Sequence, residues 1–483
     1  MISRFGTALC LALGWVLTLS TVSLSAQQGG ASTDTDRQLA RNIFRELVEI
    51  NTTDSVGSVT AAAEAMQRRL LDAGFPAEDL HLLGPNDRKK NLVARYRGRQ
   101  GSALKPVLII CHLDVVEARR EDWTTDPFKF VEKDGYFYGR GTYDMKDSDA
   151  ASVAAFIRLR HSGFVPVRDI ILALTADEEG GKSNGVAWLL QNHRDLVDAE
   201  FAINPDAGGL TTVDGKAVAL DVEASEKTYA DFLLLATAPG GHSSEPMPGN
   251  PIYRIATALG KLETTSFPFE LNEVTRAQFA ALSKVTPGKL GVEMQGVLKT
   301  PTDSQALAAL SSNRTYNPLL RTTCVATMMN AGHAFNALPQ QAQANVNCRI
   351  LPGHTQEQVR QDLIKIFADP QITVKYVSDS HEVSDTAPDR ASAPPPPLIS
   401  AVFDPLKQTL AEFWPNVPII PSMEAGASDS IYTTAAGIPS YGIAGMAMDR
   451  DENRAHGKDE RIRREDFDRG VDFFTSYLRN MTK

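Results

Sequence analysis

Two apolar runs predict strands that are buried on both faces of a sheet. Residues 107–111 read VLIIC, and residues 169–176 read DIILALTA. Both runs are short and rich in aliphatic residues, and polar residues follow each of them, which is typical of fully buried strands. Strands of this kind belong in the middle of an α/β sheet whose two faces are covered by helices. The pattern therefore predicts an α/β fold.

Helical periodicity flanks these strands. Residues 38–50 place Leu39, Ile43, Phe44 and Leu47 on one side of a helix. The same kind of pattern predicts helices at 58–73, 150–161, 185–192, 403–413 and 464–480. Shorter apolar runs predict strands at 91–96, 201–204 and 441–444.

The middle of the chain predicts a second folding unit. Residues 226–377 follow the order strand, helix, insert, strand, strand, helix, strand, which is that of a ferredoxin-like layer. Its strands are predicted at 226–236, 322–331, 342–351 and 372–377, its helices at 251–262 and 355–367, and its partly helical insert at 264–320. Thr355 and Gln358 are spaced as a capping box at the start of the second helix. A proline-rich stretch at 386–397 then predicts an extended spacer, with an SH3-type ligand as the alternative.

Composition limits the classes of partner. The chain has 483 residues, which favours two or three domains. Its formal net charge of -10 argues against non-specific nucleic-acid binding and against attraction to anionic membranes.

The first 26 residues differ from the rest. Arg4 precedes an apolar run from Ala8 to Val22, and small residues end at Ala26. This pattern predicts a cleaved signal peptide, with an uncleaved N-terminal anchor as the alternative. No later stretch is long and apolar enough to span a bilayer, so we expect an exported protein, either periplasmic or extracellular, without a membrane span in the mature chain.

Three cysteines remain once Cys10 leaves with the signal peptide. Cys111, Cys324 and Cys348 all lie in strand-like runs, which favours buried free thiols. The alternative is a bridge between Cys324 and Cys348, whose predicted strands are neighbours.

Polar side chains gather where the predicted strands end. His112 and Asp114 are two residues apart and point the same way, as an imidazole and the carboxylate that orients it do at a metal. Glu178 and Glu179 follow the second buried strand, where carboxylates are costly unless a cation is near. Asp206 follows the strand at 201–204.

A glycine-rich segment at 134–147 presents Asp144, and it lacks the GxGxxG and GxxxxGK[ST] patterns of a phosphate loop. Sites in open α/β sheets lie at the carboxyl ends of the strands. His and carboxylate ligands there suit a pair of zinc ions or related divalent metals. The competing interpretation is a solvated acidic turn.

With these residues in view, the chain resembles the dizinc metallopeptidase family of aminoacylase, carboxypeptidase G, acetylornithine deacetylase and succinyl-diaminopimelate desuccinylase. The resemblance covers nearly all of the mature chain. It rests on HLDVV at His112, GRGTYDMKD around Asp144, TADEEGG around Glu178, PDAGG at Asp206, GGHSSEP at His242, NALP at Asn336, NCRILPG at Arg349, GASD at Asp429 and AHGKDE at His456.

The resemblance implies a zinc-exopeptidase-like catalytic domain, a mixed central sheet flanked by helices, with an inserted ferredoxin-like α+β lid and dimerisation domain. The catalytic domain would comprise residues 37–220 and 398–483. The lid would span 221–380, and the proline-rich linker 381–397.

The resemblance also implies roles for single residues. His112, Asp144 and Asp206 would hold one zinc ion. Asp144, Glu179 and His456 would hold the other, so that Asp144 bridges the pair; cobalt and manganese are the alternative metals. Glu178 would be the general base, and Asp114 would orient His112. The lid residues that would bind the substrate carboxylate and stabilise the oxyanion are His242, Asn336 and Arg349.

The resemblance implies hydrolysis of an amide bond next to a free carboxylate, in a short peptide or an N-acyl amino acid, by a homodimer formed through the lid. The rivals are a non-peptide amidohydrolase acting on carbamoyl or ureido compounds and a binding protein that lost catalysis. The chain departs from the family pattern in three places: the metal ligand Asp206 stands where many members have glutamate, Gly-Ala-Ser-Asp replaces the commoner Gly-Gly-Thr-Asp, and the insert at 264–320 is longer than in compact members. The long insert bears on the substrate pocket and on the dimer contact.

Overall fold

The structure is a computed structural model that describes residues 33–378, 381–389, 392–426, 428–449 and 452–483. The predicted signal peptide at 1–26 lies outside the described residues. So do residues 390–391 of the predicted linker and Ala427 of the GASD segment. Within the described part of the chain, no helix is both long enough and apolar enough to cross a bilayer.

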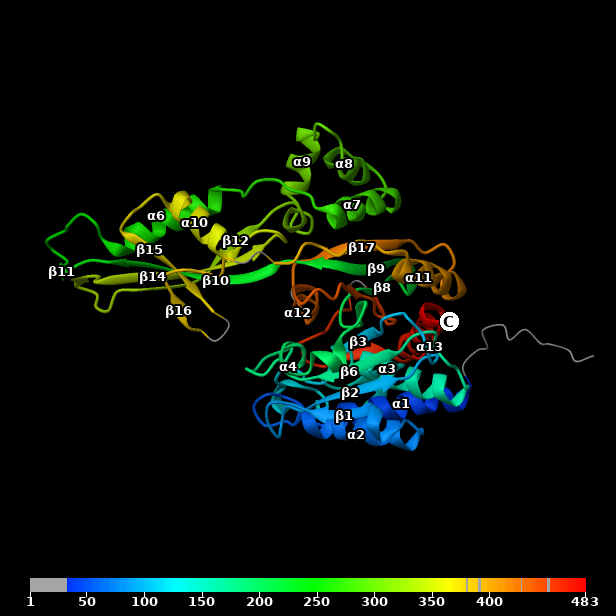
Figure 1. Ribbon diagram of the computed structural model, residues 1–483. Coiled ribbons are helices and arrows are strands. Elements are labelled where there is room, and N and C mark those ends of the chain that lie inside the picture. The colour runs from blue at the N-terminus through cyan, green and yellow to red at the C-terminus, as the bar shows by residue number, and fades with distance from the viewer. Residues whose placement is uncertain (1–32, 379–380, 390–391, 427, 450–451) are drawn as a thin grey trace, which may run out of the picture. The chain divides into compact units, whose positions relative to one another are not determined.

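A mixed ten-stranded sheet organises the fold (Figure 1). Along it lie β1 (Leu80–Leu83), β2 (Asn91–Tyr96), β6 (Ile170–Thr175), β3 (Val107–His112), β7 (Phe201–Asn204), β18 (Ser440–Gly442), β9 (Lys216–Glu226), β8 (Gly209–Val213) and β19 (Ala447–Asp449), and β17 (Ile419–Glu424) pairs with β9. Strand β3 lies between β6 and β7 and runs parallel to both. The predicted α/β class is confirmed, and the two apolar runs are neighbouring central strands.

Helices cover both faces of this sheet, as the two-sided burial of β3 requires. Val107 and Ile109 pack in the core formed with α1 (Asp34–Glu49), α2 (Val59–Asp72), α3 (Lys146–His161), α11 (Ser400–Phe413) and α13 (Arg464–Thr482). Leu108 and Ile110 face the other core, with α4 (Gly185–Asn192), α5 (Arg194–Val197) and α12 (Ser430–Ala435). The alternation along one strand reflects its period of two. Figure 1 shows α1 in blue and α13 in red beside the same strands, so the two ends of the described chain share one layer.

The predicted ferredoxin-like order is also confirmed. A second antiparallel sheet runs β12 (Thr323–Ala331), β14 (Gln341–Ile350), β10 (Thr228–Thr237), β15 (Ile372–Val377) and β16 (Val383–Ser384). Helices α6 (Pro251–Thr264) and α10 (Gln356–Phe367) pack against it around a separate core that includes Phe232 and Val346. The capping box of Thr355 and Gln358 forms as predicted. We call this unit the lid sheet below.

The insert packs on the first sheet. It forms α7 (Glu273–Val285), α8 (Lys289–Val297), α9 (Ser304–Ser311) and the short η3 (Asn317–Leu319). Val274 and Phe279 are buried in the core that also holds Met423 of β17. The backbone N–H of Met423 donates to Gln278 Oε1 at 3.2 Å. Helix α7 is therefore attached to the ten-stranded sheet through β17.

Short elements complete the fold. Strands β4 (Val131–Lys133), β5 (Tyr136–Tyr138) and β20 (Arg461–Arg463) form a small antiparallel sheet, and β11 (Gly241–His242) pairs with β13 (Ala337–Leu338). Two short 3-10 turns are η1 (Ala77–Asp79) and η2 (Arg120–Asp122).

The expectation of three free thiols is wrong for two of the cysteines. Cys111 is free and buried, as predicted. Cys324 and Cys348 form a disulfide instead. The physical reason is the register of two antiparallel neighbours: Cys324 of β12 stands directly opposite Cys348 of β14, with 4.1 Å between the Cα atoms. The bridged alternative is thus the correct one.

Candidate metal centre

The parallel strands β6, β3 and β7 bring their polar ends together. His112 is the last residue of β3, and its Nε2 lies 3.4 Å from Asp206 Oδ1, just beyond the end of β7. The same Nε2 lies 3.4 Å from Asp144 Oδ1, from the glycine-rich segment. The strand ends thus form one cluster at the carboxyl edge, where the sequence places it.

Asp144 links two histidines. Its Oδ1 faces His112, and its Oδ2 lies 2.9 Å from His456 Nε2. His456 Nε2 also lies 2.9 Å from Glu179 Oε1. The cluster therefore consists of two overlapping groups that share the Asp144 carboxylate, one with His112 and Asp206 and one with His456 and Glu179.

Asp114 holds the loop that carries the two glutamates. Its Oδ1 accepts from the backbone N–H of Glu178 at 3.2 Å, and its Oδ2 accepts from that of Glu179 at 3.0 Å. The main-chain oxygen of Asp114 lies 3.1 Å from His112 Nδ1, closer than its carboxylate at 3.8 Å. Asp114 thus orients both the imidazole and the glutamates.

The cluster carries more negative than positive charge. Burial raises the pKa of Glu178 to about 9, and the neighbouring carboxylates of Asp206 and Asp429 act in the same direction. Hydrogen bonds with Asp144 and Glu179 raise the pKa of His456 to about 10. Buried carboxylates of this kind must either bind protons or face cations. A divalent cation beside them would favour the ionised carboxylates.

The donor atoms fit a divalent metal. His112 Nε2 is buried and has no hydrogen-bond partner among the described residues. If Nδ1 carries the proton toward the Asp114 main-chain oxygen, the free lone pair on Nε2 faces Asp144 and Asp206, which is the arrangement of a metal-bound imidazole. Two groups have ligand atoms within 4.8 Å of one another: His112, Asp144 and Glu179 in one, and His112, Glu178 and Asp206 in the other. Imidazole and carboxylate donors suit zinc and related metals.

Glu460 positions the Asp144 loop, and sequence reasoning missed it. Its buried carboxylate accepts at Oε1 from the backbone N–H groups of Tyr143 at 2.8 Å and Asp144 at 3.1 Å. At Oε2 it accepts from Arg140 Nη1 at 2.6 Å and from the N–H of Gly141 at 3.1 Å. The only available signal was its place in the AHGKDE segment, four residues after His456.

Asp429 has a comparable supporting position. Its Oδ1 accepts from Asn184 Nδ2 at 2.6 Å, and burial raises its pKa to about 7. It therefore ties the start of α12 to the residue that caps α4.

The three predicted substrate-binding residues lie outside the cluster. His242 and Asn336 are close together, since Ser243 N donates to Asn336 O at 3.1 Å and β11 pairs with β13, but both side chains are exposed. Arg349 Nη1 donates to Ala425 O at 3.1 Å, and its guanidinium lies 4.8 Å from the centre of the Tyr229 ring. None of the three is among the described residues that line the cleft over the cluster.

That cleft has a volume of about 1140 Å³. Asp144, Glu178 and His456 line one part of it, and Leu282 and Leu290 of the insert line another. The cluster is therefore open to a ligand much larger than a metal ion.

Comparison with known proteins gives a consistent result. A sequence model described as peptidase family M20/M25/M40 matches residues 108–480. The human N-fatty-acyl-amino acid synthase/hydrolase PM20D1 is 30% identical over 395 residues, which is 79% of this chain and 75% of that protein. A probable carboxypeptidase S-like protein of Dictyostelium discoideum is 30% identical over 407 residues, 81% of this chain and 75% of that one. An M20 family metallo-carboxypeptidase of Sulfolobus solfataricus has the same fold, with a TM-score of 0.66 at 17% identity, covering 92% of this chain and 99% of that one.

Proposed function

The chain belongs to peptidase family M20/M25/M40 and is a metallohydrolase of the carboxypeptidase, aminoacylase and N-acyl amino acid hydrolase type. From this premise we propose that it is an exported dizinc enzyme that cleaves an amide bond next to a free carboxylate. The observation that carries the proposal is the Asp144 carboxylate between two histidines. In this proposal His112 and Asp206 hold one zinc ion and Glu179 and His456 the other, with Asp144 shared; cobalt and manganese are the alternative metals.

When bound, the zinc pair supplies Lewis acidity to the amide carbonyl and to the attacking water. Glu178 acts as the general base: its carboxylate takes a proton from the water that attacks the carbonyl and returns it to the leaving amine. Its location supports this role, because it lines the cleft while Asp114 holds its backbone.

The lid residues recognise the substrate in this proposal. Arg349 binds the free carboxylate, since guanidinium matches a carboxylate as a fork, and Asn336 assists it. His242 donates to the developing oxyanion. Because His242 and Asn336 are exposed rather than in the cleft, they would reach the site of a second subunit or act after lid movement.

A homodimer through the lid sheet fits these requirements. Strand β12 lies at the edge of its sheet, so its outer backbone groups can pair with another strand. Val325, Met328 and Met329 on it are exposed, with 71% of Met328 accessible. An exposed apolar edge is the usual mark of a protein interface.

The disulfide supports export. Bridges such as Cys324–Cys348 persist in oxidising compartments, which agrees with the signal peptide predicted from residues 1–26.

Two substrate classes are in competition. The first is a short peptide cut at its C-terminal residue, as in a carboxypeptidase or dipeptidase. The second is an N-acyl amino acid, and the 30% identity with a protein named as an N-fatty-acyl-amino acid synthase/hydrolase favours it.

The test is hydrolysis by the purified mature chain with zinc, across dipeptides, C-terminally blocked peptides, N-acyl amino acids and ureido acids. We expect turnover that requires a free carboxylate and is lost in Glu178→Gln. Turnover of blocked or ureido substrates alone would refute the proposed specificity. Unchanged turnover in Glu178→Gln would refute the proposed base, and binding without any turnover would favour a non-catalytic binding protein.

A further inference from the structure

A groove of about 680 Å³ lies between α6 and the start of β12. The helix contributes Leu259, Gly260 and Leu262 to it, and the stretches at the two ends of the insert contribute Phe267 and Arg321. None of the described residues that line this groove also lines the cleft over the metal cluster. The groove is therefore separate from the metal centre, and it is large enough for a small organic ligand. We call it the α6 groove.

Arg321 is a buried cation in the wall of the α6 groove and has no counter-ion. It is 8% exposed, and no ion pair joins it to a carboxylate of the described residues. Its Nη1 donates to Phe267 O at 3.0 Å, and its Nη2 donates to Ser311 Oγ at 2.6 Å. Both acceptors are neutral, and Nε has no hydrogen-bond partner among the described residues. The guanidinium therefore has unused donors and an uncompensated charge.

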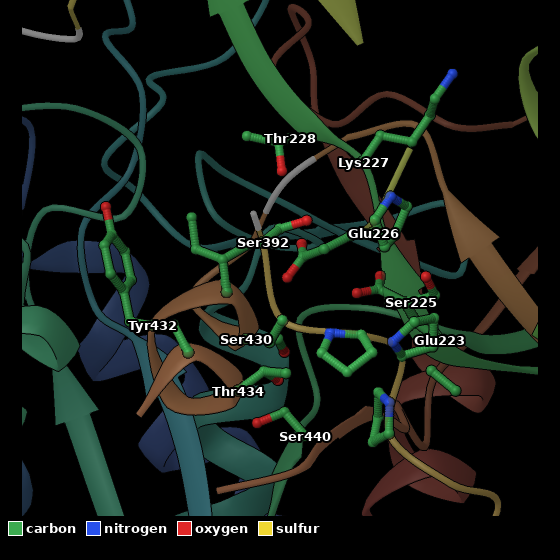
Figure 2. Close-up of a pocket in the computed structure, with 18 of the residues that line it drawn as sticks. Glu223, Ser225, Glu226, Lys227, Thr228, Ser392, Ser430, Tyr432, Thr434 and Ser440 are labelled. Carbon is green, nitrogen blue, oxygen red and sulfur yellow. The ribbon is translucent and has the colours of Figure 1, made fainter. Parts of the chain in front are cut away.

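Loss of a proton does not relieve this charge. Burial lowers the pKa of Arg321, but a guanidinium keeps its proton at neutral pH. The cavity drawn in Figure 2 differs, because burial raises the pKa of Glu226 to about 8 and that of Glu223 well above its usual value, so both carboxyl groups hold protons. Lys227 points away from that cavity, and its Nζ donates to three oxygen atoms of the segment 318–323 at 2.8 to 3.3 Å. Of these buried groups, Arg321 is the one that still requires an ion of opposite charge.

The wall that holds Arg321 is fixed before any ligand binds. Cys324 of the same wall is bridged to Cys348 of β14. The backbone N–H of Leu351, just beyond β14, donates to Thr322 Oγ1 at 3.1 Å. A site built on ordered residues loses little free energy to further ordering when it binds a ligand.

The other lining residues limit the kind of anion. Among the described lining residues, Arg321 is the only basic side chain and Glu263 the only acidic one. A single positive charge with a carboxylate on the same groove favours a monoanion over a dianion such as phosphate. A guanidinium matches the geometry of a carboxylate. Apolar side chains line the rest of the groove, and they include Leu259, Leu262, Phe267 and Val325.

We propose that the α6 groove binds a small organic monocarboxylate, whose carboxylate pairs with Arg321 and whose apolar body lies against Leu259 and Phe267. The ligand is distinct from the substrate, since the residues of the metal cluster do not line this groove. The inference goes beyond the proposed hydrolysis and does not depend on it.

Calorimetry on the zinc-loaded mature chain tests the site. The probe is benzoate, with benzyl alcohol as its neutral counterpart and sulfate as a dianion. We expect benzoate to bind more tightly than either. Arg321→Gln should weaken benzoate binding about tenfold or more, because it removes hydrogen bonds from a charged donor to the ligand. Arg321→Lys keeps the charge and should retain part of the affinity.

Two further variants separate the groove from the rest of the molecule. Gly260→Trp fills the groove from α6 and leaves Arg321 intact. A side chain at Gly260 would begin in open space, so this helix position accepts a bulky residue, and benzoate binding in the groove should be lost. Arg314→Gln is the matched control, because Arg314 is exposed on the turn between α9 and η3 and does not line the groove. Its affinity for benzoate should equal that of the wild type.

Several results would overturn the site. They are equal binding of benzoate and benzyl alcohol, tighter binding of sulfate, and equal losses in Arg321→Gln and Arg314→Gln. Unchanged benzoate binding in Gly260→Trp would also overturn it, because the carboxylate would then occupy the metal cleft. Sedimentation velocity detects the remaining source of an anion. If the wild type bound no benzoate and Arg321→Gln dissociated a dimer, a second copy of the chain would supply the anion in place of a ligand. Hydrolysis enters none of these measurements, so failure of the proposed function would leave them unchanged.

Discussion

Glu460 offers a sharp test of how the metal cluster is held. Each of its carboxylate oxygens accepts two hydrogen bonds from the loop 140–144. In Glu460→Gln the amide group replaces one oxygen, so in either orientation an NH₂ group faces two donors. The variant also leaves the buried Arg140 guanidinium without its counter-charge.

The magnitude follows from these losses. Breaking a buried ion pair by removing one charge costs about 3–5 kcal/mol. Part of that cost falls on the position of Asp144, whose backbone N–H is one of the four donors. Changing a residue that supports metal ligands usually weakens metal binding about 10–100-fold. Because Glu460 accepts four hydrogen bonds from the loop that carries Asp144, we expect a loss of zinc affinity near the upper end of this range, about 100-fold.

The assay is zinc competition against a chelating dye, with thermal unfolding measured on the same samples. Glu452→Gln is the control: it lies on the same segment and contacts Tyr136 and Arg461, but its side chain is one third exposed and touches no residue of the cluster. We expect its zinc affinity to equal that of the wild type. Zinc affinity of Glu460→Gln within threefold of the wild type would refute the role given to Glu460.

Three further predictions address the lid sheet. The double variant Cys324→Ser/Cys348→Ser should lower the free energy of unfolding by roughly 3 kcal/mol, because the bridge closes a loop with a sequence separation of 24. Reduction of the bridge in the wild type should have the same effect, so equal stability of the reduced and oxidised wild type in urea would contradict the prediction. The hydrogen bond from Arg360 lowers the pKa of Glu357 to about 2 from 4.5, so the contribution of the ionised Glu357 to the free energy of unfolding should be complete above about pH 4.5 and decline as the pH falls toward 2. The stability difference between wild type and Glu357→Gln, measured by urea unfolding from pH 7 to pH 3, should therefore shrink on acidification. A constant difference would exclude this contribution. Met328→Lys should convert the proposed dimer to a monomer in sedimentation velocity, and an unchanged sedimentation coefficient would place the interface elsewhere.

The sequence predicts the centre of the fold well because that part depends on local pattern. Residues 107–111 are apolar without interruption, which only a strand covered on both faces can use, and β3 is such a strand. His112 and Asp206 could be placed at one edge because the ends of parallel strands meet there. Their joint location required no knowledge of side-chain contacts.

The remaining features depend on contacts between distant segments, which local patterns do not encode. The Cys324–Cys348 bridge follows from the register of β12 on β14, and a shift by one residue would have placed the thiols on opposite faces. The cradle formed by Glu460 depends on a loop more than 300 residues earlier in the chain. The position of α7 on β17 likewise became visible only in the structure, although the sequence marked the insert as unusual.

The most direct test of the account is a zinc titration of the chelator-treated protein, followed by hydrolysis of the best substrate. The cluster around Asp144 predicts that activity rises to its maximum at two zinc ions per chain, and that Asp144→Asn neither binds the pair nor regains activity. Full activity at one zinc ion per chain, or zinc-dependent activity retained in Asp144→Asn, would contradict a shared two-metal centre.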